Sequence, residues 1–355
     1  MSGWPQGTMT ATAITGPGRV EAMSLPIPAE RDDAILVRTS YVGLCGTDLE
    51  LLHGTASYLR DELTSYPVIF GHEWSGVVTA VGAAAGWVRP GDRVTGQTMI
   101  ACRHCRMCRR HEPQLCEQLT EVGLYGAHGA AADYVCIRAD TATVLPPAVS
   151  LAHGTLIEPA VTVVGAFDAA GCTLSDTVAV VGTGTIGLLA LQLARRLAPA
   201  VDVIGVDPAG MDLALRLGAR RAYGPGEAPR DAYSLVIEAS GATSALAQSI
   251  ALARPGARVA LVGVANGEAS GITPGDITLK GVAILGIRHG LAYYDQTVDL
   301  LASGVMDAGP LIDTVVDAAS AAEAFSRLEH GRQGPPKVLL RFAGDPQEPD
   351  GAAAR

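Results

Sequence analysis

Four of the seven cysteines in this chain lie close together, at Cys102, Cys105, Cys108 and Cys116. Tetrahedral zinc is bound by four thiolates at about 2.3 Å, and a shell closed by protein ligands leaves no position for a substrate. The first residues, MSGWPQGTMT, show no secretory signal, so this spacing indicates metal binding rather than disulfides. The sequence therefore predicts a structural zinc lobe at about residues 100–118, in a cytoplasmic protein.

The same four cysteines could instead form a nucleic-acid-binding zinc knuckle or contain a redox dithiol. A four-thiolate zinc site carries a net charge of about −2, which nearby cations can offset. The lobe supplies four of them, Arg103, Arg106, Arg109 and Arg110. The same arginines would suit a nucleic-acid zinc knuckle, but the net charge of −10 for the whole chain opposes nucleic-acid binding. A redox dithiol would explain only two of the four cysteines.

Three further segments contain side chains that can bind a catalytic metal: Gly43-Leu-Cys45-Gly-Thr47-Asp48, Gly71-His72-Glu73 and Leu156-Ile-Glu158-Pro159. Each has an ordinary explanation on its own, since an isolated cysteine is commonly a small core residue, and Glu158 could be a charge at a helix start. A catalytic zinc takes three protein ligands and leaves a fourth position for water or substrate. A cysteine, a histidine and a carboxylate would supply that shell only if the fold gathers them.

A dinucleotide site is predicted where the apolar run Val178–Val181 meets a glycine-rich turn and a second apolar stretch. The turn reads Gly182-Thr-Gly184-Thr185-Ile186-Gly187, and we expect its residues to contact the cofactor. The three glycines would allow a tight turn, a close approach of the backbone to a pyrophosphate, and close packing of helix on strand. The N-terminus of the helix would face the phosphates with unbonded N–H groups.

Asp207 follows the next apolar run, Val203–Val206. A carboxylate at this place accepts hydrogen bonds from the adenosine ribose and repels a 2′-phosphate, so NAD is favoured over NADP. The alternative is a solvated aspartate at the end of a strand.

The elements that must position these residues change in pattern near Thr155. Short β-rich segments such as Ala34–Thr39 come before it, and apolar runs alternating with helical stretches come after it. Strand–helix alternation implies a parallel sheet with both faces covered. We therefore expect an α/β protein in which a nucleotide-binding domain, 155–292, is inserted in a β-rich domain formed by 1–154 and 293–342. Residues 343–355 are expected to be a flexible tail.

Composition narrows the class of protein. A chain of 355 residues with 48% hydrophobic and 17% charged residues is globular rather than disordered, and its length suits about two domains. The uncharged stretch 177–194 approaches the length of a membrane span, but Gly182, Gly184 and Gly187 interrupt it, so no span is predicted.

Across roughly residues 10–342 the chain resembles the zinc-containing medium-chain dehydrogenase/reductase family. The matching segments, all in the family's order, are VGLCGTDLE, YPVIFGHEWSGVV, PGDRV, the four-cysteine lobe, LIEPAV, VVGTGTIG and IEASG. Glu158-Pro159 resembles the polyol, threonine and cyclitol dehydrogenase branch of the family. Several of the segments together look most like the 2-deoxy-scyllo-inosamine dehydrogenases of aminocyclitol biosynthesis.

The resemblance implies a GroES-like catalytic domain around the inserted Rossmann domain, and a homodimer or homotetramer. By it, Cys45 and His72 bind catalytic zinc, and Glu73 and Glu158 complete the shell directly, through water or by exchange. Thr47 would start the proton relay, and Asp48 would orient the zinc ligands.

Two positions depart from the family's pattern. Glu50 stands where many relatives carry histidine, so it is the candidate for the outer relay. Gly165-Ala166 stands where His-Ala is usual. Four residues are candidates to line a substrate cleft: Tyr58, Trp74, Arg288 and His289.

The expected function is a dehydrogenase that contains two zinc ions and uses NAD. It would interconvert a secondary alcohol and a ketone on a small polar substrate, without nucleic-acid or membrane partners. A zinc-free quinone or enoyl reductase and a non-catalytic NAD-binding relative are the alternatives.

Overall fold

The structure is a computed structural model that describes residues 3–265, 267–268, 271–330 and 334–343. All of the expected flexible tail except Ala343 lies outside these residues. The chain divides into two compact units. The first comprises residues up to Glu158, with the returning segments Ile312–Gly331 and Lys337–Arg355, and the second comprises Pro159–Leu311 and Arg332–Pro336.

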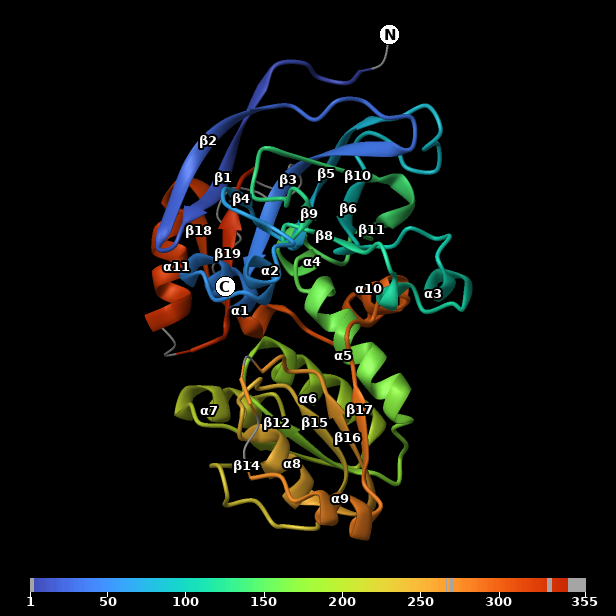
Figure 1. The fold of residues 1–355 in the computed structure, drawn as a ribbon, viewed down its shortest axis with the longest axis vertical. Helices are drawn as coiled ribbons and strands as arrows, with labels where there is room; N and C mark the ends of the chain where they lie inside the picture. Colours follow the sequence, from blue (N-terminus) through green and yellow to red (C-terminus); the bar gives the residue numbers. More distant parts are fainter. Residues whose placement is uncertain (1–2, 266, 269–270, 331–333, 344–355) are drawn as a thin grey trace. The chain divides into compact units, whose positions relative to one another are not determined.

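The first unit is built from mainly antiparallel sheets (Figure 1). Its strands are β1 (Thr8–Gly16), β2 (Arg19–Pro26), β3 (Ala34–Leu44), β4 (Val68–Ile69), β5 (Glu73–Val81), β6 (Arg93–Gly96), β7 (Met99–Ile100), β8 (Thr120–Val122), β9 (Gly126–Ala127), β10 (Tyr134–Arg138), β11 (Ala142–Val144), β18 (Ile312–Asp317) and β19 (Lys337–Arg341). The main sheet has the order β11-β6-β5-β3-β19-β18, and β10 also pairs with β3. Within the unit, β18 pairs with β19, and β8 with β9, in parallel. Helices α1 (Gly46–His53), α2 (Ser57–Arg60), α4 (Leu151–Gly154) and α11 (Ala321–His330) accompany these strands, and α5 (Ile157–Ala170) begins at the end of the unit.

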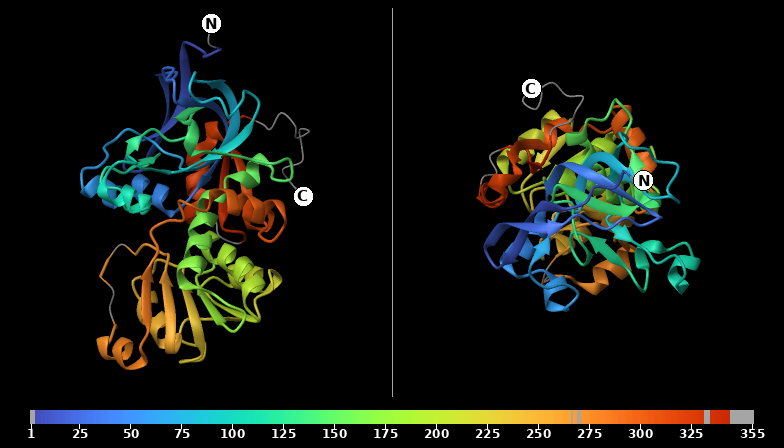
Figure 2. Two further views of the ribbon diagram at one scale, coloured as in Figure 1. Left: turned by 90° about the vertical axis from the view of Figure 1, so that its right-hand side faces the viewer. Right: turned by 90° about the horizontal axis from the view of Figure 1, so that it is seen from above.

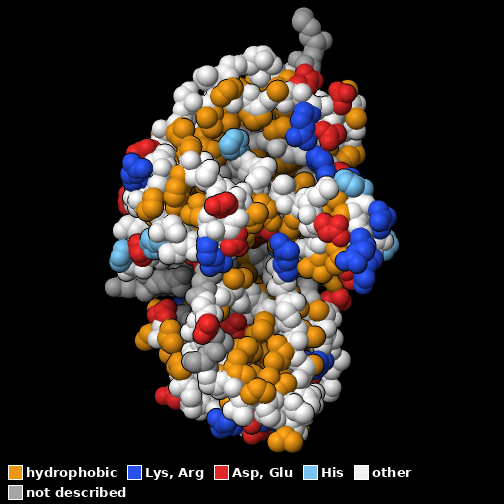
Figure 3. All heavy atoms as spheres, in the orientation of Figure 1, with side chains coloured by type: hydrophobic (Ala, Val, Ile, Leu, Met, Phe, Trp, Pro, Cys, Tyr) orange, Lys and Arg blue, Asp and Glu red, His pale blue; other side chains and the backbone are white. Residues whose placement is uncertain are grey.

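The cysteine-rich lobe is a separate small element of this unit. Strands β7, β8 and β9 form a three-stranded sheet, and α3 (Arg106–Arg109) carries part of the cysteine motif. Lys and Arg side chains gather on the surface over α3 (Figure 3), as the sequence predicts for the four-thiolate segment. Three of these arginines pair with carboxylates: Arg103 with Asp140, Arg106 with Glu117 and Arg110 with Glu112.

The second unit contains a fully parallel sheet with the strand order β14-β13-β12-β15-β16-β17. Its strands are β12 (Thr177–Val181), β13 (Ala200–Ile204), β14 (Arg221–Tyr223), β15 (Tyr233–Glu238), β16 (Ala253–Leu261) and β17 (Ala283–Gly286). Its other helices are α6 (Thr185–Leu197), α7 (Pro208–Arg216), α8 (Ala245–Leu252), α9 (Pro274–Lys280) and α10 (Tyr294–Ala302). Figure 2 shows the strands side by side with helices flanking the sheet. This order reverses between β12 and β15, as in doubly wound dinucleotide-binding folds, and confirms the predicted fold class.

The second unit extends beyond the boundary expected at residue 292 and continues to Leu311. Two contacts hold the added segment there. The Tyr293 hydroxyl donates to Asp168 at 2.6 Å, and the Gln192 amide exchanges hydrogen bonds with the backbone of Asp307 at 2.9 and 2.5 Å. The segment that contains α10 therefore belongs to the second unit.

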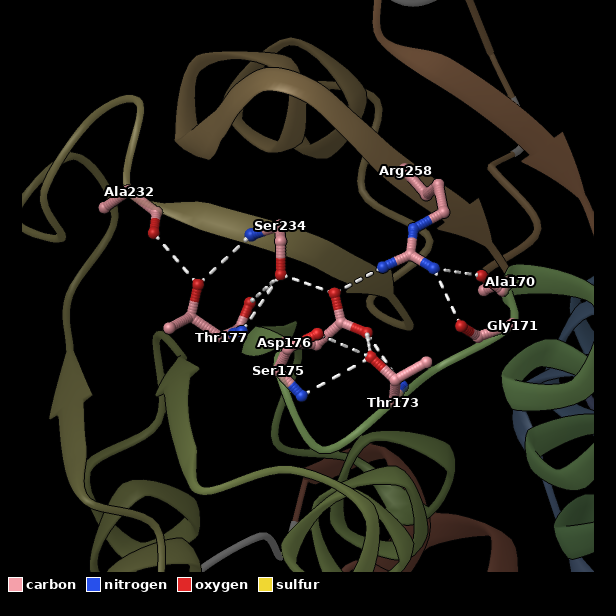
Figure 4. A network of polar contacts seen from close by, with 9 residues as sticks. All are labelled: Ala170, Gly171, Thr173, Ser175, Asp176, Thr177, Ala232, Ser234 and Arg258. Carbon is pink, nitrogen blue, oxygen red and sulfur yellow. Dashed lines mark hydrogen bonds and ion pairs between the residues drawn. The ribbon is translucent and has the colours of Figure 1, made fainter.

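A buried carboxylate ties together the N-terminal ends of β12 and β15 (Figure 4). Asp176 accepts hydrogen bonds from the Ser234 hydroxyl at 2.6 Å and from the Thr173 N–H at 2.8 Å, and it pairs with Arg258. Arg258 also donates to the carbonyls of Ala170 and Gly171. Burial opposes ionisation of Asp176, but these donors outweigh it and lower the pKa of the carboxyl.

Replacing Asp176 with alanine should lower the free energy of unfolding at pH 7 by about 3 kcal/mol, because several buried donors lose a charged acceptor. A depressed folded-state pKa stabilises the fold above the unfolded value, near pH 4, and the gain is lost as pH falls through the folded value. Urea unfolding should therefore show a difference in the free energy of unfolding between the wild-type protein and Asp176→Ala that is large at pH 7 and smaller below pH 4. Asp212→Ala, at an exposed aspartate, is the control, and an equal loss in both variants would contradict the assignment.

Candidate zinc centres and dinucleotide site

Cys45 is placed by the helix that follows it. It is the N-cap of α1, and its sulfur accepts a hydrogen bond from the Thr47 N–H at 3.3 Å. The Asp48 carboxylate reaches back to the N–H of Cys45 at 3.0 Å, which completes a capping box. A single local motif therefore fixes the thiol and the buried carboxylate next to it.

His72 lies against both of these side chains. Its Nε2 is 3.0 Å from the Cys45 sulfur and its Nδ1 is 3.5 Å from Asp48 Oδ1. Its backbone carbonyl accepts a hydrogen bond from the Thr98 hydroxyl at 2.9 Å. Burial disfavours a charged imidazole here, but the Cys45 sulfur and the Asp48 carboxylate outweigh burial and raise the pKa of His72 well above its usual range. The surroundings of His72 therefore favour positive charge.

Two glutamates flank His72 on the other side. One ligand atom each from His72, Glu73 and Glu158 lies within 4.8 Å of the other two, and the same holds for Cys45, Asp48 and His72. Glu158 lies in the first turn of α5, and Glu73 is the first residue of β5. The fold thus gathers the three segments that the sequence left separate.

Glu73 has a partner that the sequence did not indicate. Lys337, the first residue of β19, donates to both Glu73 oxygens at 2.8 and 2.6 Å and to the Leu44 carbonyl at 3.0 Å. Burial raises the pKa of Glu73, the Lys337 ammonium opposes that rise, and Glu158 adds to it. A lysine opening an apolar strand was the only signal in the sequence.

These side chains suit a bound cation. Three carboxylates are buried here, those of Asp48, Glu73 and Glu158. Among the residues described above, a single buried ammonium, that of Lys337, opposes them. An excess of buried negative charge is costly unless a cation offsets it. A cysteine, a histidine and a carboxylate are also ligand types that zinc accepts in catalytic sites.

The four cysteines of the lobe match a closed tetrahedral site more directly. The sulfur atoms of Cys102 and Cys108 are 3.9 Å apart, and those of Cys105 and Cys116 are 3.8 Å apart. Ligands at 2.3 Å in a tetrahedron lie about 3.8 Å from one another, so the spacing fits zinc without rearrangement. Backbone N–H groups of Cys108 and Glu117 lower the pKa of Cys105 to about 6, which favours a thiolate at neutral pH.

The glycine turn after β12 has the shape expected for a pyrophosphate site. Gly182 has a φ of 118°, and a Cβ on Gly187 would lie 2.1 Å from the Gly182 carbonyl oxygen. Gly184 is the N-cap of α6 and faces open space, and no side chain caps that helix end, which begins with Thr185 and Ile186. Unbonded N–H groups at an open helix N-terminus fit an anion.

Asp207 does not stand at a strand end, as the sequence suggested. Strand β13 stops at Ile204, and Asp207 is the N-cap of α7, accepting from the N–H groups of Ala209 at 3.2 Å and Gly210 at 3.0 Å. The apolar run Val203–Val206 extends two residues past the end of β13. Val206 is exposed, so its apolar side chain does not mark a buried strand position.

The remaining candidates, for the substrate cleft and the outer proton relay, differ in how deeply they are buried. Trp74 is fully buried in the core of the first unit, so it cannot line a cleft, whereas Tyr58 is half-buried. Glu50 is half-buried on α1. In the second unit Arg288 is exposed and His289 half-buried.

The departure at position 165 has a packing reason. A Cβ on Gly165 would lie 3.1 Å from the Cα of Gly290 and 3.4 Å from the ring of Tyr293. A histidine at this position would therefore require the backbone near Gly290 to move by a few tenths of an ångström.

Comparison with known proteins agrees with this geometry. Residues 31–147 match the model of the alcohol dehydrogenase GroES-like domain, and residues 185–303 match that of the zinc-binding dehydrogenase domain. A probable D-xylulose reductase A from Aspergillus fumigatus is 30% identical over 91% of this chain and 96% of its own length.

Solved structures give the same result with both nicotinamide cofactors. A zinc-binding dehydrogenase from Sinorhizobium meliloti bound to NADP is 29% identical with a TM-score of 0.87, covering 95% of this chain and 100% of that one. The alcohol dehydrogenase rspB from Escherichia coli in complex with NADH is 27% identical with a TM-score of 0.87, covering 94% and 99%. This chain belongs to the zinc-binding, medium-chain dehydrogenase/reductase family, with a GroES-like unit and a Rossmann unit.

Proposed function

We propose that this enzyme interconverts a secondary alcohol and a ketone on a small polar substrate such as a polyol, cyclitol, amino-cyclitol, sugar or amino-alcohol. The observation that carries the proposal is that His72 lies in two groups of candidate metal ligands, one with Cys45 and Asp48 and one with Glu73 and Glu158. Membership of the family makes it an oxidoreductase that acts on alcohols with zinc and a nicotinamide cofactor.

In this proposal Cys45 and His72 hold the catalytic zinc, with Glu158 as the third ligand, directly or through water. When bound, zinc supplies a Lewis acid that lowers the pKa of the alcohol, and the nicotinamide accepts a hydride. Asp48 Oδ1 lies 3.5 Å from His72 Nδ1 and would orient the ring with Nε2 toward Cys45. Glu73, held by Lys337, stays beside the shell as an exchange position.

The chain's own groups would carry the proton away. Thr47 is half-buried, two residues after Cys45, and its hydroxyl is the proposed first acceptor of the proton from the substrate alcohol. Glu50 lies one turn further along α1 and is the proposed outer acceptor, in place of the family's histidine. The structural zinc, at Cys102, Cys105, Cys108 and Cys116, takes no part in this transfer because its shell is closed.

NAD is the proposed cofactor, bound at the glycine turn that runs from Gly182 to Gly187. The Asp207 carboxylate repels a 2′-phosphate. Asp207→Asn keeps an N-cap acceptor but removes the charge, so it should lower the preference for NAD over NADP about tenfold. Steady-state kinetics with both cofactors measures this, and Asp212→Asn on the same helix is the control. An unchanged ratio would rule out Asp207 as the discriminating residue.

A panel of polyols, cyclitols, amino-cyclitols and threonine, assayed for NAD reduction with zinc-replete protein, tests the function. Metal analysis separates the alternatives, because the proposed enzyme binds two zinc ions per chain and a non-catalytic relative would keep one. A zinc-free quinone or enoyl reductase has no use for Cys45, His72 and Glu158 together. Turnover of quinones or enones by the metal-free protein would establish that alternative instead.

Location and assembly complete the proposal. Among the described residues no helix is long and apolar enough to cross a membrane. A reducing cytoplasm suits a lobe of four thiolates. We propose a homodimer or homotetramer there, which light scattering of the zinc-loaded protein would test.

A further inference from the structure

A further buried carboxylate of the first unit belongs neither to the cysteine lobe nor to the proposed catalytic zinc ligands. Glu121, in β8, is 3% exposed. Its Oε2 accepts a hydrogen bond from the Tyr58 hydroxyl at 3.2 Å, and its Oε1 accepts one from the Tyr125 hydroxyl at 3.1 Å. The two rings lie side by side, with centroids 5.1 Å apart. A charge this deeply buried, held by two phenols from different segments, is a built site rather than a solvated surface group.

The segment that carries this carboxylate lies beside the segment that carries the proposed catalytic histidine. Glu121 pairs with Met99 across β7 and β8, and the neighbouring Thr98 donates to the His72 carbonyl. Two residues further along, a Cβ on Gly123 would lie 2.9 Å from the backbone of Gly71. The segment that carries Glu121 is thus packed directly on the one that carries His72.

Tyr58 is the accessible member of the group. It is half-buried, whereas Glu121 and Tyr125 are buried. Burial raises the pKa of the Tyr58 hydroxyl, Glu121 raises it further, and His72 lowers it, so Tyr58 stays neutral and interacts electrostatically with His72. Because its proton is donated to Glu121, the Tyr58 oxygen can meet a further partner only as an acceptor. A hydrogen bond to a carboxylate also polarises the hydroxyl and strengthens it in that role.

We propose that Tyr58 binds a hydrogen-bond donor of the substrate, a hydroxyl or ammonium group, and that Glu121 positions Tyr58 for this contact. The pair would then select neutral or amino-substituted polyols and reject phosphorylated ones, because a buried carboxylate repels a phosphate. This inference rests on the proposed function, since it assigns the substrate class for that same site. Tyr58 is a substrate-binding residue in this scheme, and Glu121 acts through it.

Three matched probes test the inference: D-glucitol, 2-amino-2-deoxy-D-glucitol and D-glucitol 6-phosphate. Zinc-loaded wild-type protein with NAD should show a KM for the phosphate at least about tenfold above that for D-glucitol. Tyr58→Phe should raise the KM for D-glucitol about tenfold and change kcat less than about twofold, since it removes one ground-state contact. Glu121→Gln should raise the KM of the amino compound more than that of D-glucitol, because it removes a charge.

Tyr66→Phe is the control, because Tyr66 is another half-buried tyrosine of this unit whose hydroxyl donates to the Leu51 carbonyl at 2.6 Å. A merely structural Tyr58 would change the unfolding temperature and leave the KM ratios as they are. Turnover with KM values that do not depend on Tyr58, or a preference for the phosphate, would overturn the inference and leave the proposed function standing.

Calorimetric binding of the same probes to the zinc- and NAD-saturated protein tests the role of Tyr58 separately from the proposed dehydrogenase function. Binding that weakens in Tyr58→Phe supports the inference even where the wild-type protein does not turn the probe over. A wild-type protein that neither oxidises nor binds any of the three overturns the inference. The function itself is then decided by the wider panel of polyols, cyclitols and threonine.

Discussion

Replacement of Cys45 by alanine is expected to lower alcohol oxidation by at least about a thousandfold while the protein keeps its fold. The thiol is one of three proposed zinc ligands, and a catalytic zinc accounts for several kcal/mol of transition-state stabilisation, each 1.4 kcal/mol being a factor of ten. Cys45 is only half-buried, so the loss of its sulfur leaves a small defect in the core. Zinc analysis should give two ions per chain for the wild-type protein and one for the variant.

Cys136→Ala is the matched control, because Cys136 is half-buried in β10 of the same unit and belongs to neither metal group. It should keep both zinc ions and the wild-type rate. Far-UV circular dichroism and the unfolding midpoint verify that both variants are folded. Retained activity in Cys45→Ala would remove the catalytic zinc from the proposal, and two zinc ions with no activity would move the role of Cys45 away from the metal.

Much of the fold followed from local patterns in the sequence. The apolar runs of the second unit predicted its strands within a few residues, because strands buried on both faces read as continuous apolar segments. The hairpin of β1 and β2 has a weaker signal, since β2 is largely exposed and its apolar residues Val20, Met23 and Leu25 are only partly buried. The sequence predicts Asp207 directly after a strand because Val206 is apolar, but Val206 is exposed and lies beyond the last residue of β13, Ile204.

The site divides along the same line. The lobe was predictable from spacing alone, since its four sulfurs come from one short segment. The proposed catalytic ligands were visible only through the family resemblance, because tertiary structure is what brings Cys45 and Glu158 each close to His72. Lys337 and Glu121 were missed for this reason, since each acquires its meaning from a partner distant in the chain. The roles of all these residues remain predictions until the variants are measured.

Lys337→Met should be the most destabilising single change in the catalytic unit. The Lys337 and Glu73 side chains are 2% and 3% exposed, and the substitution leaves Glu73 without its cation beside Glu158. Breaking a buried pair in this way costs about 3–5 kcal/mol, whereas removing both charges is often neutral. The double variant Glu73→Gln/Lys337→Met should therefore regain most of the loss in urea unfolding. Lys280→Met, whose partner Asp231 is half exposed, should cost less than about 1 kcal/mol.

The pH dependence of the stability lost in Lys337→Met shows whether the unpaired charge of Glu73 causes the loss. Without the ammonium, the pKa of Glu73 rises further above its unfolded value, so the folded variant binds a proton that the unfolded chain does not. A raised folded-state pKa stabilises the fold below the unfolded value, and the gain is lost as pH rises, so the deficit should shrink as the pH falls toward 5. A deficit independent of pH would point to lost packing of the lysine stem instead.

Zinc provides the last comparison, because a bound cation offsets the same negative charge that Lys337 offsets. If Glu73 and Glu158 face the catalytic metal, the deficit of Lys337→Met should be smaller in the zinc-loaded protein than in the metal-free protein. The comparison needs Cys45→Ala/Lys337→Met as a partner variant, since it keeps the lobe's zinc and lacks the catalytic one. An equal deficit in the two loaded proteins would separate the Glu73–Lys337 pair from the metal and leave it a purely structural element of the sheet.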